Sequence, residues 1–342
     1  MQDPLAKLGL KHPLIVAPMA GGPSSPELVA ASSAAGAIGS IGAAYATPVA
    51  IADFVEKVRA RTDRPFAINL FIQQPQPQIE ATMVDRAIAA TAKYRAELDL
   101  PLPQFASPYE EDFDQQFEAV LKAKPAVLSF VFGLLAPRYM QAAHKAGMLI
   151  IGTATTPEEA KALEDSGVDA ITLQGFEAGG HRGIFDPAAE DSEIPLNELM
   201  AQCLGKARVP LIAAGGIMTA ADIRATLARG AAAVQMGTAF LATSEAGTSE
   251  PYRAALQGPE RRTRTTRAFS GRFARGMENR FMREMDADAV MPFPAQNKFT
   301  RDLRAAAAAK GTSEFLSLWA GTGKGDLWQG STSALIESLF AD

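Results

Sequence analysis

Short apolar runs rich in β-forming residues recur along the chain. Eight such runs lie at 14–17, 37–41, 66–70, 126–130, 149–153, 170–173, 211–214 and 233–236. Each run is continuously apolar and does not alternate with polar positions, which is typical of parallel strands covered by helices on both faces. The pattern therefore predicts eight buried parallel strands.

Helix start signals lie between most of these runs. Pro26 follows two serines, Thr156 stands directly before Pro157, and Thr219 precedes a run of good helix formers that should end at Gly230. Serine or threonine followed by proline is the usual order at a helix N-terminus, and glycine often follows the C-terminus. Eight β/α units within about 240 residues predict an α/β fold of the (β/α)8 TIM-barrel class, with a doubly wound open sheet as the alternative.

Three segments are longer than the simple repeat requires: 71–125, 175–197 and 238–342. We expect helices near 79–96 and 112–123 in the insertion after strand three, and a long loop after strand six. The chain is thereby divided into a barrel core, residues 1–238, and an extension, 239–342, of helices and loops packed on the barrel or forming a small lid subdomain.

Glycines follow the seventh and eighth predicted strands, as Gly215-Gly216 and Gly237-Thr238. In barrels these two loops commonly form a phosphate site, because glycine lets backbone N–H groups approach an anion closely. Tight barrel turns would need glycine as well. No P-loop is present and no GxGxxG follows strand one, so a mononucleotide phosphate fits better than a dinucleotide cofactor.

His181 lies among small residues on the loop after strand six, where barrel active sites form. An imidazole titrates near neutrality and can accept or lend a proton, so we interpret His181 as catalytic rather than structural. His12 and His144 fall before strands one and five, away from the expected site, and are interpreted as structural.

Two amides and a methionine also occupy strand ends. Asn69 and Gln174 can each donate and accept hydrogen bonds, which suits the edge of a flavin or nucleobase ring. A satisfied polar pair at the barrel rim is the alternative. Met19 follows Pro18 and would pack either on a flat ring or in the core.

Composition excludes several classes of protein. The 342 residues carry 33 Lys plus Arg against 38 Asp plus Glu, a net charge of −5, which argues against a general binder of nucleic acid or anionic membranes. The single cysteine, Cys203, can form no internal disulfide. A cysteine-based zinc site needs more than one cysteine ligand, so no metal is expected. The N-terminus lacks an apolar signal core and no apolar run could span a bilayer, so a cytoplasmic location is expected.

One segment departs from this mild acidity. Residues 251–283 hold nine arginines against Glu260 and Glu278, a local charge of +7 that leaves −12 for the rest. Such a cluster could bind RNA in a non-enzymatic protein or attract an anionic substrate. Because its aromatics are few and the rest of the chain is acidic, a solvated lid or an intramolecular pairing surface is the favoured interpretation.

Five ordered motifs carry a resemblance that covers essentially the whole chain. They are APMAGGPSSPELVAASSAAGAIG at 17–39, GFEAGGHRG at 175–183, AAGGI at 213–217, QMGTAFLATSEA at 235–246 and FSGRFARGMENRF at 269–281. Together they resemble the nitronate monooxygenase family, formerly called 2-nitropropane dioxygenases. Flavin-dependent enoyl-ACP reductases share the glycine-histidine loop, so an FMN- and NAD(P)H-dependent reductase of that type is the alternative.

The resemblance implies an FMN-dependent barrel that oxidises alkyl nitronates with O2 to carbonyl compounds and nitrite. Propionate 3-nitronate, a toxin, is the expected substrate, detoxification the expected role, and a monomer or homodimer the expected state. His181 would be catalytic and would remove the α-proton from neutral nitroalkanes. Backbone N–H groups and protonated His181 would stabilise a bound nitronate. The residues expected to hold or flank FMN are Met19, Ala20, Gly21, Asn69, Gln174, Gly179, Gly180, Gly215, Gly216, Gln235, Met236, Gly237 and Thr238.

Two positions bear on the substrate pocket. Val131 stands at the end of strand four, where some relatives carry a polar residue, and this predicts a more apolar pocket. Tyr109 lies in an insertion that could cover the flavin, and we do not count it among the substrate contacts.

Overall fold

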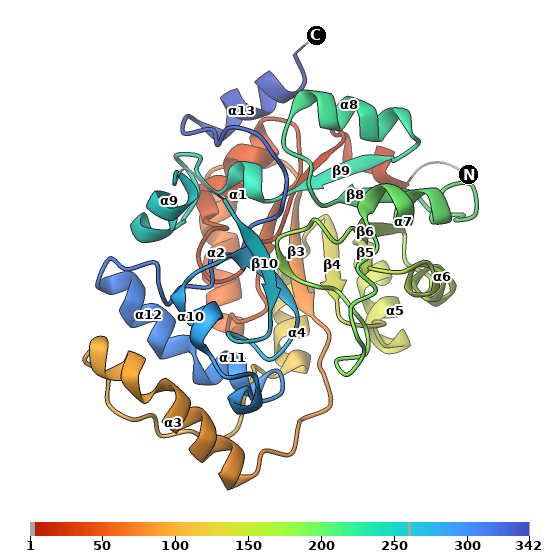
Figure 1. Ribbon diagram of the computed structural model, residues 1–342. Helices are drawn as coiled ribbons and strands as arrows, with labels where there is room; N and C mark the ends of the chain where they lie inside the picture. Colours follow the sequence, from red (N-terminus) through yellow and green to blue (C-terminus); the bar gives the residue numbers. More distant parts are fainter. Residues whose placement is uncertain (1–3, 259–260, 342) are drawn as a thin grey trace.

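The computed structural model describes residues 4–258 and 261–341 and contains an eight-stranded parallel sheet closed into a barrel (Figure 1). Its strands are β1 (Leu14–Val16), β2 (Gly39–Gly42), β3 (Phe66–Phe71), β4 (Val127–Val131), β5 (Leu149–Ala154), β6 (Ala170–Gln174), β8 (Leu211–Ala214) and β9 (Ala233–Met236). The order β1-β9-β8-β6-β5-β4-β3-β2 closes between the ends because Val16 N–H donates to Ile38 at 2.8 Å. The TIM barrel and its eight predicted strands are confirmed, and the open sheet is excluded.

Helices cover the barrel as the start signals predict. The outer ring consists of α1 (Pro26–Ala34), α2 (Pro48–Arg59), α4 (Phe113–Ala123), α5 (Pro137–Lys145), α6 (Pro157–Ser166), α7 (Leu196–Cys203), α8 (Ala220–Ala228) and α13 (Thr332–Leu339). Ser25, Thr156 and Thr219 each accept a backbone N–H as N-caps. Helix α13 packs between α1 and α8, where the helix after β9 belongs.

The strand register brings the predicted site to one end of the barrel. Asn69 on β3 pairs with Ser129 on β4, Gln174 on β6 pairs with Ala214 on β8, and Ala214 pairs with Gln235 on β9. Strands of one direction end at one edge, which we call the rim. The opposite end is filled by an apolar cluster of strand residues together with Leu5 from the short 3-10 helix η1 (Pro4–Leu8).

The insertion after β3 and the C-terminal extension pack against each other as well as on the barrel. Their helices are α3 (Ala81–Glu97), α9 (Glu250–Leu256), α10 (Arg280–Glu284), α11 (Ala295–Phe299) and α12 (Arg301–Ala309), with the short 3-10 helices η2 (Thr238–Phe240) and η3 (Ala287–Ala289). Tyr94 of α3 contacts the rings of Phe281 and Phe315. These three rings belong to an apolar cluster that is separate from the core of the barrel. A domain boundary at 238/239 stays a prediction.

The segment after β6 is more ordered than the predicted long loop. Gly180–His181 forms a short strand, β7, that pairs antiparallel with β11 (Ala274–Met277), which in turn pairs with β10 (Thr263–Thr266). His181 stands opposite Ala274 in this small sheet. Its backbone is thus held by the extension, a long-range pairing that no local sequence signal announces.

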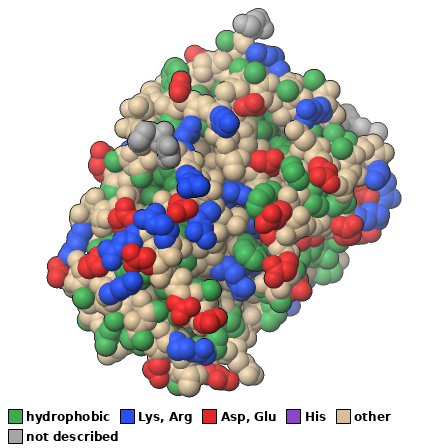
Figure 2. Space-filling view, viewed as in Figure 1, with side chains coloured by type: hydrophobic (Ala, Val, Ile, Leu, Met, Phe, Trp, Pro, Cys, Tyr) green, Lys and Arg blue, Asp and Glu red, His purple; other side chains and the backbone are tan. Residues whose placement is uncertain are grey.

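The arginine-rich segment is engaged within the protein, as the pairing interpretation expects. Arg280 pairs with Glu97 and Glu284 at 2.7 and 2.9 Å, and Arg253 donates to backbone carbonyls. Glu260 lies outside the described residues. On the face in Figure 2, Lys and Arg side chains lie among Asp and Glu rather than in a patch of one sign. Within residues 4–258 and 261–341, no helix combines the length and apolar character needed to cross a membrane.

Candidate active site

His181 sits in a cage of four aromatic side chains at the rim. Its ring centroid lies 5.7 Å from that of Phe71, 5.9 Å from Phe132, 6.1 Å from Phe293 and 5.6 Å from Trp319. Its Nε2 is buried and has no hydrogen-bond partner among the described residues. Buried polar atoms in folded proteins are nearly always paired, so this nitrogen points to a ligand or substrate.

The imidazole is held in its neutral form. Burial, reinforced by the positive charges of Arg272 and Arg304, lowers the pKa of His181 to about 3. A neutral imidazole can accept a proton. The expectation that protonated His181 stabilises a nitronate needs correction for the resting site: the cation can form only after proton transfer, beside the anion that this transfer creates.

The glycine loops of the rim converge. Gly215 and Gly216 follow β8 with φ of +121° and +72°, a region that favours glycine. A Cβ at Gly179 would lie 2.6 Å from the backbone nitrogen of Gly321, so only glycine allows this approach. That same Gly321 N–H donates to Thr238 Oγ1 at 3.0 Å. The loops after β6, β8 and β9 and the C-terminal segment therefore meet at one place.

The turn after β1 joins this rim. A Cβ on Gly42 would lie 2.5 Å from the nitrogen of Ala20, and one on Gly237 would lie 3.6 Å from Met19 Sδ. Gly21 has φ of +86° and open space where a side chain would be. Met19 and Ala20 are thus placed beside the ends of β9 and β2.

The predicted amides differ in how far the protein already satisfies them. Asn69 is buried and donates from Nδ2 to Ser129 Oγ at 3.0 Å, which leaves its carbonyl oxygen for another donor. Gln235 is half-buried, and its side chain has no hydrogen bond to the described residues. Its neighbour Met236 is buried in the core.

Gln174 mainly positions the histidine loop. Its Nε2 donates to the carbonyl of His181 at 2.9 Å, and its Oε1 accepts from Gly183 N at 2.8 Å and from Arg182 at 3.1 Å. One N–H of the amide remains for a ligand. The interpretation as a satisfied rim residue is therefore correct for most of this amide.

These features fit a flat cofactor that carries a phosphate. The glycine loops can present N–H groups to an anion, while Asn69, Gln235 and one N–H of Gln174 can serve a ring edge. Gly180, with φ of +79°, has open space where a side chain would be. Among the described residues, no three His, Cys, Asp or Glu side chains are grouped as a metal site would require.

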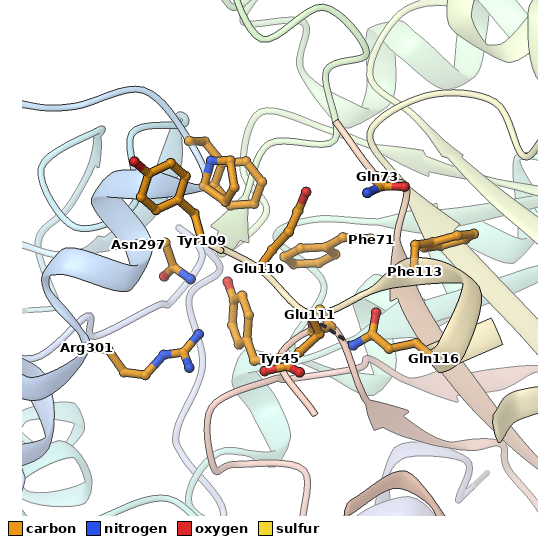
Figure 3. Close-up of a pocket in the computed structure, with 13 residues that line it drawn as sticks. Tyr45, Phe71, Gln73, Tyr109, Glu110, Glu111, Phe113, Gln116, Asn297 and Arg301 are labelled. Atoms are coloured by element: carbon orange, nitrogen blue, oxygen red, sulfur yellow. Dashed lines mark hydrogen bonds between the residues drawn. The ribbon is translucent and has the colours of Figure 1, made fainter. Parts of the chain in front are cut away.

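A small pocket, partly open to solvent, adjoins the histidine cage (Figure 3). It shares the rings of Phe71 and Phe293 with that cage. Its other walls are formed by Ala44, Tyr45, Gln73, Tyr109, Glu110, Glu111, Phe113, Gln116, Pro294, Asn297 and Arg301. Tyr109, which lies in the insertion that the sequence predicts over the site, thus lines the cavity.

The cavity is lined both by hydrogen-bond donors and by carboxyl groups. Tyr45, Asn297 and Arg301 lie together in Figure 3, and burial raises the pKa of Tyr45 to about 12, so its phenol stays protonated. Burial likewise raises the pKa of Glu110 to about 7. Both signs of charge therefore face the cavity near neutral pH.

Sequence reasoning missed most of the aromatic cage. Phe71 directly follows predicted strand three and Phe132 lies two residues beyond predicted strand four, so their positions alone could have indicated them. Phe293 and Trp319 come from the extension, where no pattern predicts contact with the rim. Val131 ends β4 opposite Phe71, and the more apolar pocket predicted from that position stays a prediction.

Comparisons with known proteins agree with this geometry. The family model described as nitronate monooxygenase matches residues 2–342. The chain is 39% identical to a nitronate monooxygenase of Pseudomonas aeruginosa over 92% of each chain, and 41% identical to one of Paraburkholderia phytofirmans over 98% of this chain and 91% of that protein.

Two solved structures are also similar. The nitroalkane oxidase of Streptomyces ansochromogenes superposes with a TM-score of 0.92 at 39% identity, covering 98% of this chain and 96% of that one. FabK of Thermotoga maritima superposes with a TM-score of 0.74 at 25% identity, covering 99% and 95%.

Proposed function

Because the chain belongs to the nitronate monooxygenase family, we propose that it oxidises alkyl nitronates with O2 to carbonyl compounds and nitrite, using FMN. The observation that carries this proposal is the orphaned, buried Nε2 of His181 beside a glycine-lined rim. We take propionate 3-nitronate as the substrate.

The rim residues would hold FMN as follows. The backbone at Gly179, Gly216 and Gly237-Thr238 would bind the phosphate, and Asn69 would meet the ring edge. Gly180, Gly215, Gln174, Gln235 and Met236 complete the rim, and Met19, Ala20 and Gly21 would flank the ring. When bound, FMN supplies the redox chemistry that links nitronate oxidation to O2.

The chain's own residues position the substrate and move one proton. Neutral His181 would accept the α-proton of a nitroalkane at its orphaned nitrogen, whereas a preformed nitronate needs no such step. Gln174 donates a hydrogen bond to the His181 carbonyl and so fixes the backbone that carries the imidazole. The aromatic cage keeps water away from the imidazole.

An aerobic assay tests the proposal directly. We expect purified protein to be yellow, to release FMN on denaturation, and to consume O2 and form nitrite with propionate 3-nitronate. Protein that cannot be reconstituted with FMN, or that binds FMN and leaves nitronates intact, would contradict it.

The enoyl reductase alternative has one observation in its favour, the structural likeness to FabK. It predicts rapid bleaching of the flavin by NADH without O2. We expect slow bleaching instead, so anaerobic stopped-flow mixing with NADH separates the two activities.

Arg301 is expected to favour substrates with an acidic end. It lines the cavity, is exposed, and forms no salt bridge with the described residues. A charge-assisted hydrogen bond contributes about 1.5–3 kcal/mol, or roughly 10- to 100-fold in binding. Arg301→Met should therefore raise KM for propionate 3-nitronate by roughly that factor and leave KM for ethyl nitronate nearly unchanged.

Arg224→Met is the matched control, because Arg224 is an exposed, unpaired arginine of the described chain on the outer helix α8. It should change neither KM. Equal changes for both substrates in Arg301→Met would contradict a role in recognising the acidic end.

A further inference from the structure

Phe132, which forms one wall of the histidine cage, has a strained backbone. Its φ is +79°, in the left-handed region that large side chains rarely adopt, and its side chain is buried. Such a conformation is energetically unfavourable and persists only where the surrounding structure enforces it. The strain lies directly beside the candidate base.

Two side chains contact Phe132, one at its backbone and one at its ring. Gln74 donates from Nε2 to the carbonyl of Phe132 at 2.9 Å, and its Oε1 accepts from Nη1 of Arg272 at 3.1 Å. The guanidinium carbon of Arg272 lies 3.9 Å from the centroid of the Phe132 ring. Backbone and ring are thus both held, by residues that come from distant parts of the chain.

Arg272 is unusual because it is 3% exposed and its hydrogen-bond partners among the described residues are neutral rather than carboxylates. Besides Gln74, it donates to the carbonyl of Ile184, just beyond β7. Its position therefore ties together the segment after β3, the segment after β7 and the loop before β11. Glu159 and Asp186 act on this buried cation only from beyond salt-bridge distance, so its stacking and hydrogen bonds compensate much of the cost of its burial.

The restrained ring meets His181 edge-on. The interplanar angle is 84°, and Phe132 also contacts Phe71 at 4.6 Å and Phe293 at 5.6 Å between centroids. If the backbone of Phe132 relaxed to negative φ, the side chain would leave this direction. One side of the imidazole would then open.

We propose that Gln74 and Arg272 are positioning residues that hold Phe132 in its left-handed conformation and its ring against His181, so that the imidazole stays dry and aimed at the substrate. This inference rests on the proposed function of His181 as the base that removes a proton from nitroalkanes.

The charges around His181 separate the effect of changing Gln74 from the effect of changing Arg272. Arg272 and Arg304 act on it through their positive charge, and Arg182, next in sequence, is paired with Asp191 at 2.7 Å. Removing Gln74 keeps all these charges and loosens the wall, and it also takes away the acceptor of Arg272 Nη1. Since burial is the main cause of the lowered pKa of His181, admitting water should raise that pKa.

NMR titration of the histidine rings in the resting protein is the decisive test. The chain has only three histidines, so His12 and His144 serve as internal references. In Gln74→Leu we expect the pKa of His181 to rise by at least about one unit, a tenfold change in proton affinity, while the references stay in place. Gln115→Leu, an exposed glutamine on α4, should leave all three unchanged.

Arg272→Lys keeps the charge but loses the planar stack, so it should raise the pKa of His181 in the same direction. It also serves as the second variant if Gln74→Leu does not fold. A folded variant whose His181 titrates as in wild type would overturn the proposal. Oxidation of ethyl nitronate by wild type is measured in parallel, because its failure would count against the proposed function and not against this positioning.

Discussion

His181→Asn should lower the turnover of neutral nitroethane by at least about a hundredfold, the usual contribution of a positioned general base. The amide fits the cage but cannot take up a proton at working pH. Ethyl nitronate has already lost that proton, so its oxidation should fall far less. The ratio of the two rates, measured by O2 consumption, isolates the proton transfer.

The pH dependence follows from the lowered pKa of His181. Because that pKa is about 3, the neutral base is present at all pH values well above 3, and the histidine itself should introduce no loss of rate between about pH 5 and 8.

The control for His181→Asn is His144→Asn, which changes a histidine paired with Asp169 away from the rim. Unchanged nitroethane turnover in His181→Asn would show that another group is the base.

Asp191→Ala should cost about 3–5 kcal/mol of folding free energy. The Asp191 carboxylate accepts a hydrogen bond from Nε of Arg182 at 2.7 Å. The Arg182 side chain is 0% exposed and the Asp191 side chain is 5% exposed. Removing the carboxylate leaves a buried guanidinium without its counter-ion. The same guanidinium donates to the Gln174 and Gly175 carbonyls, so flavin retention should fall as well.

Calorimetry of the purified variant measures this effect, with Glu190→Ala as the matched control on the same loop. Glu190 is exposed and has no side-chain partner in the described part of the chain. A loss below about 1 kcal/mol in Asp191→Ala would place the pair in the range of surface ion pairs and contradict the argument.

The barrel was predictable because its signals are local. Each strand is a compact apolar run, and Thr156 and Thr219 cap helices through residues three positions away. The rim glycines and His181 were predictable for a related reason, since barrel topology places every strand end on one side. Neither inference required knowledge of distant contacts.

The remaining parts of the site depend on long-range packing. Phe293 and Trp319 reach His181 from the extension, and β7 forms only because β11 lies beside it. The charge state of His181 also escaped prediction, because burial by rings from four separate segments determines it. Residue type and spacing contain no information about these approaches.

The return of α13 to the outer ring has a mechanical consequence. The chain leaves the barrel after Met236, crosses the histidine cage, and rejoins the wall at Thr332, where Glu245 caps α13 by accepting from the Thr332 backbone N–H and hydroxyl at 2.8 Å. The segment that covers the cage is therefore attached to the barrel at both of its ends and has no free edge. Opening the cage must therefore bend the middle of this segment. Truncating the chain before Thr332 would detach one of its two ends and loosen the wall around His181.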